Sequence, residues 1–185
     1  MNVYAGKIEV RDDPMVLGTD PVPAKYYYDA DWYELERKAV WMRSWLNVGH
    51  VCELPTAGSF IVRALDFAGA SILITRGKDE VIRAFHNVCT HRGTQLVEEA
   101  EGKATSFRCR YHSWSFGTDG SLLAAPDFER FNLDKSDCAL KQVKVEICAG
   151  LIFINFAAQP NQTLREFLGA IADESGQRKP WTLTF

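Results

Sequence analysis

Histidine is scarce in this sequence. Of the 185 residues only four are histidine: His50, His86, His91 and His112. Histidine is the commonest protein ligand for metals and a frequent acid or base in catalysis, so four of them set a limit on the chemistry that the chain can perform alone. His91 and His112 each follow a cysteine by two or three residues, whereas His50 and His86 precede their nearest cysteine.

Long runs of one residue class are also missing. The 21 Lys and Arg residues nearly balance the 24 Asp and Glu residues, and no basic run provides the surface of a nucleic-acid-binding protein. The longest apolar stretches, such as residues 151–156, fall far short of the roughly 18 residues of a membrane span. The N-terminal residues lack the apolar segment of a secretion signal. We therefore expect a soluble, cytoplasmic protein that has no nucleic-acid or membrane partner.

Cysteine is present in an odd number and is spread widely along the chain. A chain that is 46% hydrophobic over 185 residues can build its own core, so a disulfide framework is not expected. Isolated cysteines and histidines are most often core residues. We interpret five residues in this way: Cys52, Cys138, Cys148, His50 and His86.

The N-terminal third is expected to hold an irregular arm and one helix. Residues 1–28 carry three prolines and little periodicity, which predicts an arm. A helix is predicted over residues 29–45, beginning with a capping box formed by Asp31 and Glu34. Trp32, Leu35, Ala39 and Met42 fall on one face of this helix, which we expect to pack on the core.

From residue 46 onward the pattern changes to short β-branched and aromatic runs between turn residues. Residues 77–80 (GKDE) and 117–120 (GTDG) have the length and composition of hairpin loops. This spacing predicts an all-β sandwich or barrel with minor helices, covering residues 46–158. The expected strands are 60–65, 71–75, 81–86, 105–108, 114–116, 143–147 and 151–156. In the strand 143–147, alternation of Val143, Val145 and Ile147 with charged residues predicts one dry face. A helix and tail follow at 159–185, with a second capping box at Thr163 and Glu166.

Two short segments combine cysteine with histidine, as Cys89-Thr90-His91 and Cys109-Arg110-Tyr111-His112. The 17 residues between His91 and Cys109 are enough for a strand out and a strand back, so each segment is expected at the tip of a hairpin. Two tips side by side would present two thiolates and two imidazoles to one metal centre. This ligand set indicates zinc or an iron-sulfur cluster.

The pairing of ligands favours the cluster over zinc. Structural zinc sites usually take two cysteines from one loop and two histidines from a helix, whereas here each segment gives one of each. In a Rieske [2Fe-2S] cluster one iron takes both thiolates and the other takes both imidazoles. Neutral imidazoles leave the oxidised cluster uncharged, which raises its potential to about −150 to +300 mV from about −400 mV for plant-type clusters.

The residues around both segments resemble the Rieske domain of aromatic-ring-hydroxylating oxygenase α subunits. The resemblance is carried by residues 85–93 (FHNVCTHRG) and 109–116 (CRYHSWSF), and it extends over about residues 26–171. It implies that Cys89, His91, Cys109 and His112 bind the [2Fe-2S] cluster. One departure is Ser113, at a position where glycine is common in the family.

The resemblance also implies roles for residues beside the ligands. Arg92, Tyr111 and Trp114 are expected around the cluster, where Trp114 either shields it or simply fills the core. Gly93 and Gly117 are expected to let the loop backbones turn tightly and approach the bridging sulfides.

In such oxygenases the cluster takes single electrons from a ferredoxin or a reductase and passes them to a mononuclear Fe(II) that activates O₂. That iron is held by two histidines and a carboxylate in a C-terminal domain, and this chain has no histidine after His112. We therefore expect the chain to be the N-terminal part of an α subunit that acts on an aromatic compound, next to neighbouring α subunits in a trimer. No catalytic residue of the chain itself is expected.

Two other functions remain open at this point. The chain could be a stand-alone Rieske electron carrier, or a short subunit that donates to a partner oxygenase. It could also be a zinc-stabilised binding module, which purified protein with colour and acid-labile sulfide would exclude.

Overall fold

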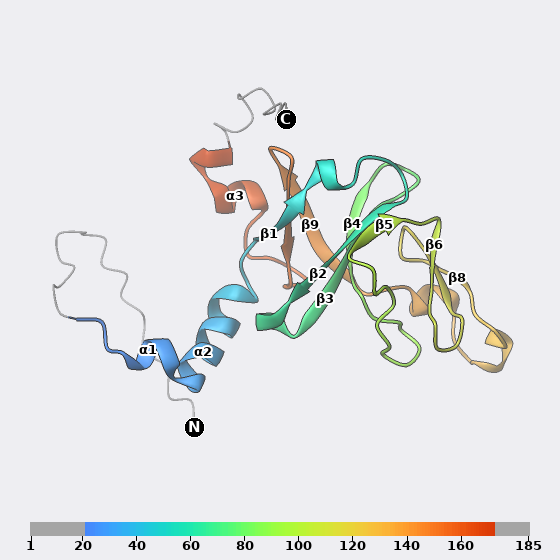
Figure 1. The fold of residues 1–185 in the computed structure, drawn as a ribbon, viewed down its shortest axis with the longest axis horizontal. Helices are drawn as coiled ribbons and strands as arrows, with labels where there is room; N and C mark the ends of the chain where they lie inside the picture. Colours follow the sequence, from blue (N-terminus) through green and yellow to red (C-terminus); the bar gives the residue numbers. More distant parts are fainter. Residues whose placement is uncertain (1–20, 173–185) are drawn as a thin grey trace. The chain divides into compact units, whose positions relative to one another are not determined.

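In the computed structural model, residues 21–172 are described. Their main element is a seven-stranded sheet in which every neighbouring pair is antiparallel. Its order is β1 (Leu46–His50), β10 (Leu151–Asn155), β9 (Gln142–Cys148), β4 (Ile82–His86), β3 (Ala70–Arg76), β2 (Ser59–Leu65) and β5 (Glu101–Lys103). A second sheet has the order β6 (Ser106–Arg108), β7 (Ser115–Gly117), β8 (Leu122–Ala124). Figure 1 shows these sheets in cyan to orange, with β6 and β8 beyond β5. The predicted all-β class with minor helices is confirmed.

All seven predicted strands are present, and three further strands were not predicted. The three are β1, β5 and β8. The sequence of β5 is Glu-Gly-Lys, and all three residues are exposed. It is a strand because it pairs with β2, where Gly102 lies opposite Phe60. No apolar alternation could have indicated it.

The central strands β2, β3 and β4 have a core cluster on each face, and one of these clusters includes the cysteines of the two Cys-His segments. Ile61, Ile72 and Ile74 point into a cluster shared with β1, β9 and β10. On the other face, Phe60, Leu73 and Phe85 belong to a second cluster. That second cluster continues through Phe107, Trp114 and Phe116 and includes Cys89 and Cys109.

Both predicted hairpin loops are confirmed, and they close in the same way. The Gly77 N–H donates to the Val81 carbonyl, and the Gly117 N–H donates to the Ser121 carbonyl, each at 2.9 Å. The fourth residue of each loop has a left-handed backbone: Glu80 with φ 63° and Gly120 with φ 84°. Short 3₁₀ turns connect other strands: η3 (Val51–Glu53), η4 (Asp66–Ala68), η5 (Phe128–Arg130) and η6 (Lys135–Cys138).

The N-terminal helical region differs from its prediction in two respects. The structure has α1 (Lys25–Tyr28) inside the predicted arm, then α2 (Ala30–Glu36), which runs into a π-helical turn, η2 (Arg37–Trp41). Asp29 caps α2, because its Oδ1 accepts the N–H groups of Asp31 and Trp32. The predicted Asp31 cap is therefore wrong by two residues.

The predicted apolar face of this helix is not part of the described core. None of the residues of α2 and η2 is buried. Residues 21–34 belong to one compact unit and residues 35–172 to another. Residues 1–20 of the predicted arm lie outside the described residues. Within residues 21–172, no helix combines the length and apolar character needed to cross a bilayer.

The end of the described chain confirms the second capping box. Thr163 Oγ1 accepts the Glu166 N–H, and Glu166 accepts the Thr163 N–H, at the start of α3 (Leu164–Leu168). The dry face predicted for β9 holds only in part: Val143 is buried, but Ile147 is 48% exposed. Glu146, predicted on the wet face, instead accepts the Leu164 N–H. Residues 173–185 lie outside the described residues.

Candidate metal centre

The two Cys-His segments fold into loops with the same backbone hydrogen bonds. We call residues 89–94 the first loop and residues 109–114 the second loop. The first loop is closed by an isolated antiparallel bridge between Val88 and Gln95, and the second by the β6–β7 hairpin. In each loop the cysteine N–H donates to the carbonyl five residues on, and the N–H four residues on donates back to the cysteine carbonyl. These bonds are Cys89 to Thr94 (2.8 Å), Gly93 to Cys89 (3.0 Å), Cys109 to Trp114 (2.7 Å) and Ser113 to Cys109 (3.0 Å).

The fourth residue after each cysteine has a left-handed backbone. Gly93 has φ 72° and Ser113 has φ 62°, so Ser113 occupies in the second loop the position that Gly93 holds in the first. A serine there adopts a backbone that side chains disfavour, and its Oγ accepts a 2.9 Å hydrogen bond from Arg108. The prediction that Gly117 shapes this loop is wrong: Gly117 is the last residue of β7 and begins the turn to β8.

The two cysteine side chains are buried next to each other. Cys89 is 2% exposed and Cys109 3% exposed. Burial raises the pKa of the Cys89 thiol, and the neighbouring Cys109 side chain raises it further. The backbone N–H groups of His91 and Arg92 act against this by hydrogen bonding to the Cys89 sulfur. These backbone N–H groups therefore stabilise negative charge on the Cys89 sulfur. Arg92 acts through its backbone N–H, while its side chain is exposed.

The two histidine side chains also lie together. The ring centroids of His91 and His112 are 4.7 Å apart, at an interplanar angle of 71°. Burial lowers the pKa of His91, and the positive charges of His112 and Arg92 add to this. The neutral imidazole, which is the form that binds metals, is thus favoured. His91 Nδ1 is buried without any hydrogen-bond partner within residues 21–172.

This arrangement fits a centre with two metal ions. Among the described residues, no three His, Cys, Asp or Glu side chains converge as they would around a single ion. The thiols instead form one pair and the imidazoles another. A [2Fe-2S] cluster needs this division, because each iron takes two protein ligands, whereas structural zinc needs four ligands around one point. The partnerless His91 Nδ1 is a ready donor atom for such a group.

Aromatic side chains cover the histidine pair. The Trp114 ring stacks on His91 with centroids 4.7 Å apart and planes 8° from parallel. Trp114 is also 3% exposed and part of the second core cluster. It therefore both covers His91 and fills the core, two roles that the sequence alone leaves as alternatives. The exposed Tyr111 ring lies 3.8 Å from that of His112. Phe131 approaches His91 edge-on at 5.8 Å.

Two residues that support the first loop were not identified from the sequence. Asn87 is completely buried, and its side chain donates to Val97 O (2.7 Å) and accepts from Val97 N–H (2.9 Å). It thereby joins the chain segments that enter and leave the first loop. Thr90 Oγ1 donates to Cys138 O at 2.7 Å. The sequence showed only an asparagine two residues before the ligand Cys89, and its partner Val97 could not be inferred from spacing.

One more contact links the two loop regions. Arg110 of the second loop pairs with Glu98 (2.6 Å) and Glu99 (3.2 Å), which follow the first loop. All three side chains are well exposed, so the pairs contribute little to stability.

The histidine pair opens onto a hollow of about 460 Å³. Trp114 and Phe131 form its apolar wall, and Arg130 lies at its edge. Because both imidazoles face this hollow, the site is accessible from the loop tips.

The remaining cysteines and histidines do not approach this site as further ligands. Cys138 is buried, as predicted for a core residue, but Cys52 is exposed, so its assignment to the core is wrong; Cys148 is half-buried. His50 Nδ1 accepts the Cys52 N–H at 3.2 Å. His86 is half-buried, and burial lowers its pKa.

The family model of the Rieske [2Fe-2S] domain matches residues 44–144. The oxygenase subunit of carnitine monooxygenase from Escherichia coli K12 is 42% identical over 144 residues, which cover 77% of this chain and 37% of that protein. The α subunit of 2-aminobenzenesulfonate 2,3-dioxygenase from Alcaligenes sp. is 35% identical, over 83% of this chain and 39% of that protein. The chain thus spans less than two fifths of each of these curated relatives.

Solved structures give the same result. The quaternary ammonium Rieske monooxygenase CntA, in complex with L-carnitine, superposes with a TM-score of 0.77 at 36% identity, covering 84% of this chain and 44% of that one.

Proposed function

The chain belongs to the Rieske [2Fe-2S] domain family, and from this we propose that Cys89, His91, Cys109 and His112 hold a [2Fe-2S] cluster that relays electrons in an oxygenase α subunit. When bound, such a cluster accepts and releases one electron at a time. The observation that carries the proposal is that two buried thiols form one pair and two imidazoles, packed edge to face, form another, on two loops with the same backbone hydrogen bonds.

Backbone and side-chain groups of the chain would control the surroundings of this cluster. The backbone N–H groups of His91 and Arg92 donate to the Cys89 sulfur and so stabilise negative charge there. Trp114 excludes water from one face of the His91 ring, while His112 stays exposed. We infer that His112, beside the exposed Tyr111, is the ligand through which electrons leave toward a partner.

For the whole protein we propose the organisation that its family suggests. Electrons come from a ferredoxin or reductase, and a mononuclear Fe(II) outside this chain accepts them, next to neighbouring α subunits in a trimer. For the substrate there are two candidates. An aromatic compound agrees with the 2-aminobenzenesulfonate dioxygenase relative, while the higher identity to carnitine monooxygenase supports a quaternary ammonium compound.

Metal and sulfide analysis tests the cluster assignment. We expect purified, reconstituted chain to be red-brown, with iron and acid-labile sulfide in equal amounts, and to lose both in His91→Ala and Cys109→Ala. The control is Cys52→Ala, which removes an exposed cysteine outside both loops and should keep the colour. A full cluster in Cys109→Ala, or zinc in place of iron, would contradict the assignment.

A further inference from the structure

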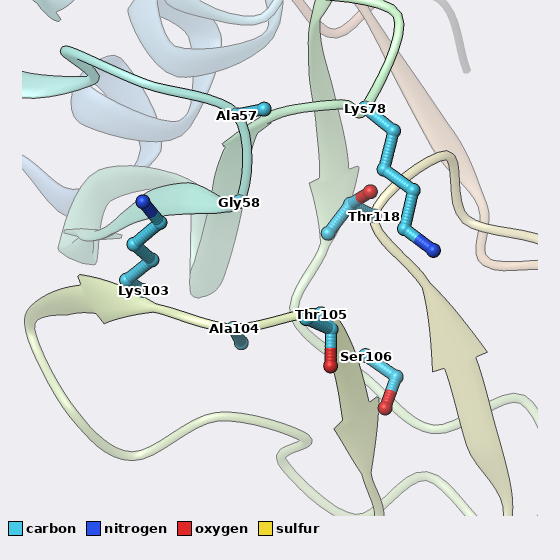
Figure 2. A pocket seen from close by; sticks show the side chains of 8 residues that line it. All are labelled: Ala57, Gly58, Lys78, Lys103, Ala104, Thr105, Ser106 and Thr118. Carbon is cyan, nitrogen blue, oxygen red and sulfur yellow. The ribbon is translucent and has the colours of Figure 1, made fainter.

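A second hollow lies at the other end of the β6–β7 hairpin from the metal centre. It measures about 520 Å³ and is formed where several separate segments meet: the residues before β2, the β3–β4 turn, the β5–β6 connection and the end of β7. Its polar side chains are Lys78, Lys103, Thr105, Ser106 and Thr118. Figure 2 shows Lys103 at one end of the hollow and Lys78 at the other. We call it the lysine hollow.

The polar groups of the lysine hollow are unpaired donors. Within residues 21–172, neither Lys78 nor Lys103 forms an ion pair, and the three hydroxyl side chains form no hydrogen bond. Thr118 is only 4% exposed, and what remains accessible of it lines the hollow. The Thr118 hydroxyl is not sealed from solvent within residues 21–172, so it is free to bind a ligand in the hollow.

No carboxylate neutralises the two lysines. Asp79 follows Lys78 in the chain, but Arg83 binds it through two hydrogen bonds of 2.9 and 2.6 Å. Asp119 follows Thr118, but it accepts the Ser121 hydroxyl and N–H. No acidic residue lines the hollow itself. In a chain with a net charge of −3, the lysine hollow is lined by two positive charges and no negative one, and the nearest carboxylates, Asp79 and Asp119, line the hollow beside it.

The lysine hollow is close to the metal centre but on a different face. Ser106 starts β6 only three residues before Cys109, so their Cα atoms are at most about 11 Å apart. The hollow at the loop tips contains both ligand histidines, whereas the lysine hollow contains none. A protein docked at the lysine hollow would leave the histidine face free.

We propose that the lysine hollow is the docking point for carboxylate side chains of the protein that delivers electrons to this domain. The proposal rests on the relay function proposed above and adds its electron-entry surface. The lysines lie at opposite ends of the hollow with hydroxyl groups nearby (Figure 2), which suits two acidic side chains of one segment better than one compact anion. Charges at the edge of such an interface act mainly on the association rate.

The test compares two charge-reversal variants of the cluster-loaded chain. Lys78→Glu/Lys103→Glu removes the docking charges. Lys141→Glu/Lys144→Glu is the matched control, because it changes the net charge equally at two exposed lysines outside the hollow. Each is mixed in a stopped-flow instrument with a reduced plant-type [2Fe-2S] ferredoxin, chosen for its acidic surface, and separately with dithionite.

We expect ferredoxin to reduce the docking variant at least about tenfold more slowly than the unmodified chain at low ionic strength. The rate at which ferredoxin reduces the control variant should change less than twofold. Added salt should remove the difference in rate between the docking variant and the unmodified chain. Dithionite should reduce all three equally. Equal slowing in both variants, or no slowing in either, would overturn the docking proposal while leaving the relay function intact.

A cluster-independent measurement separates the two proposals. Hexaglutamate titrated into ¹⁵N-labelled chain should shift the amide signals of residues 103–106 and 118, and Lys78→Glu/Lys103→Glu should abolish those shifts. Absence of shifts in the unmodified chain would also overturn the docking proposal. Failure to load any cluster would instead refute the relay function.

Discussion

Replacing Asn87 with alanine tests whether a buried amide holds the first loop in place. Its side chain makes three hydrogen bonds: to Ser71 Oγ (3.1 Å), to Val97 O (2.7 Å) and from Val97 N–H (2.9 Å). After truncation Val97 O keeps its bond from Gln95 Nε2 (3.0 Å), but Val97 N–H is stranded in the core. One stranded buried group and two weaker losses should lower the free energy of unfolding by about 2–4 kcal/mol.

Urea unfolding of the cluster-free chain measures that loss, and Asn155→Ala is the matched control. Asn155 is equally buried and makes two comparable bonds, to Arg43 O (3.0 Å) and from Ala157 N–H (2.9 Å), on β10. Both variants should lose similar stability. Only Asn87→Ala should also release iron faster when challenged with a chelator. Equal iron release from the two variants would refute a specific role for Asn87 in the first loop.

Three further changes have defined outcomes. Gly93→Ala should cost about 1 kcal/mol in urea unfolding and keep the cluster, because an added Cβ meets no atom within 4 Å but must adopt φ 72°. Trp114→Leu should lower the unfolding midpoint and shift the reduction potential in voltammetry, since it uncovers His91; an unchanged potential would contradict the covering role. Arg83 lowers the pKa of Asp79 to about 2 from 3.8. The ionised carboxylate therefore stabilises the folded state fully above pH 3.8, and this stabilisation is lost as the pH falls through about 2. The difference in urea midpoint between the unmodified chain and Asp79→Asn should accordingly vanish near pH 2.

Sequence patterns predicted the parts of the fold that depend on apolar alternation. In β3, Leu73 faces one core cluster while Ile72 and Ile74 face the other, and a run of such residues is visible in the sequence. In contrast β5 has no apolar residue and exists through its pairing with β2. Ile147 breaks the expected alternation of β9, since it is 48% exposed, whereas Glu146 accepts the Leu164 N–H at the start of α3.

The candidate site shows the same division. Cysteine and histidine in close spacing are informative by residue type, so all four candidate ligands could be named before any geometry was known. Supporting contacts depend on residues far apart in sequence, such as Thr90 with Cys138. Ser113 departs from the glycine expected at its position, and the sequence does not indicate that its backbone is left-handed.

The most direct test of the central claim is pulsed EPR on the reduced chain with ¹⁵N-labelled histidine. If His91 and His112 both ligate one iron of a [2Fe-2S] cluster, the spectrum should show hyperfine couplings from two histidine nitrogens, and the His91→Cys variant should lose one of them. A spectrum without histidine couplings, or a protein that contains metal but gives no paramagnetic reduced state, would contradict the assignment of a Rieske centre to these two loops.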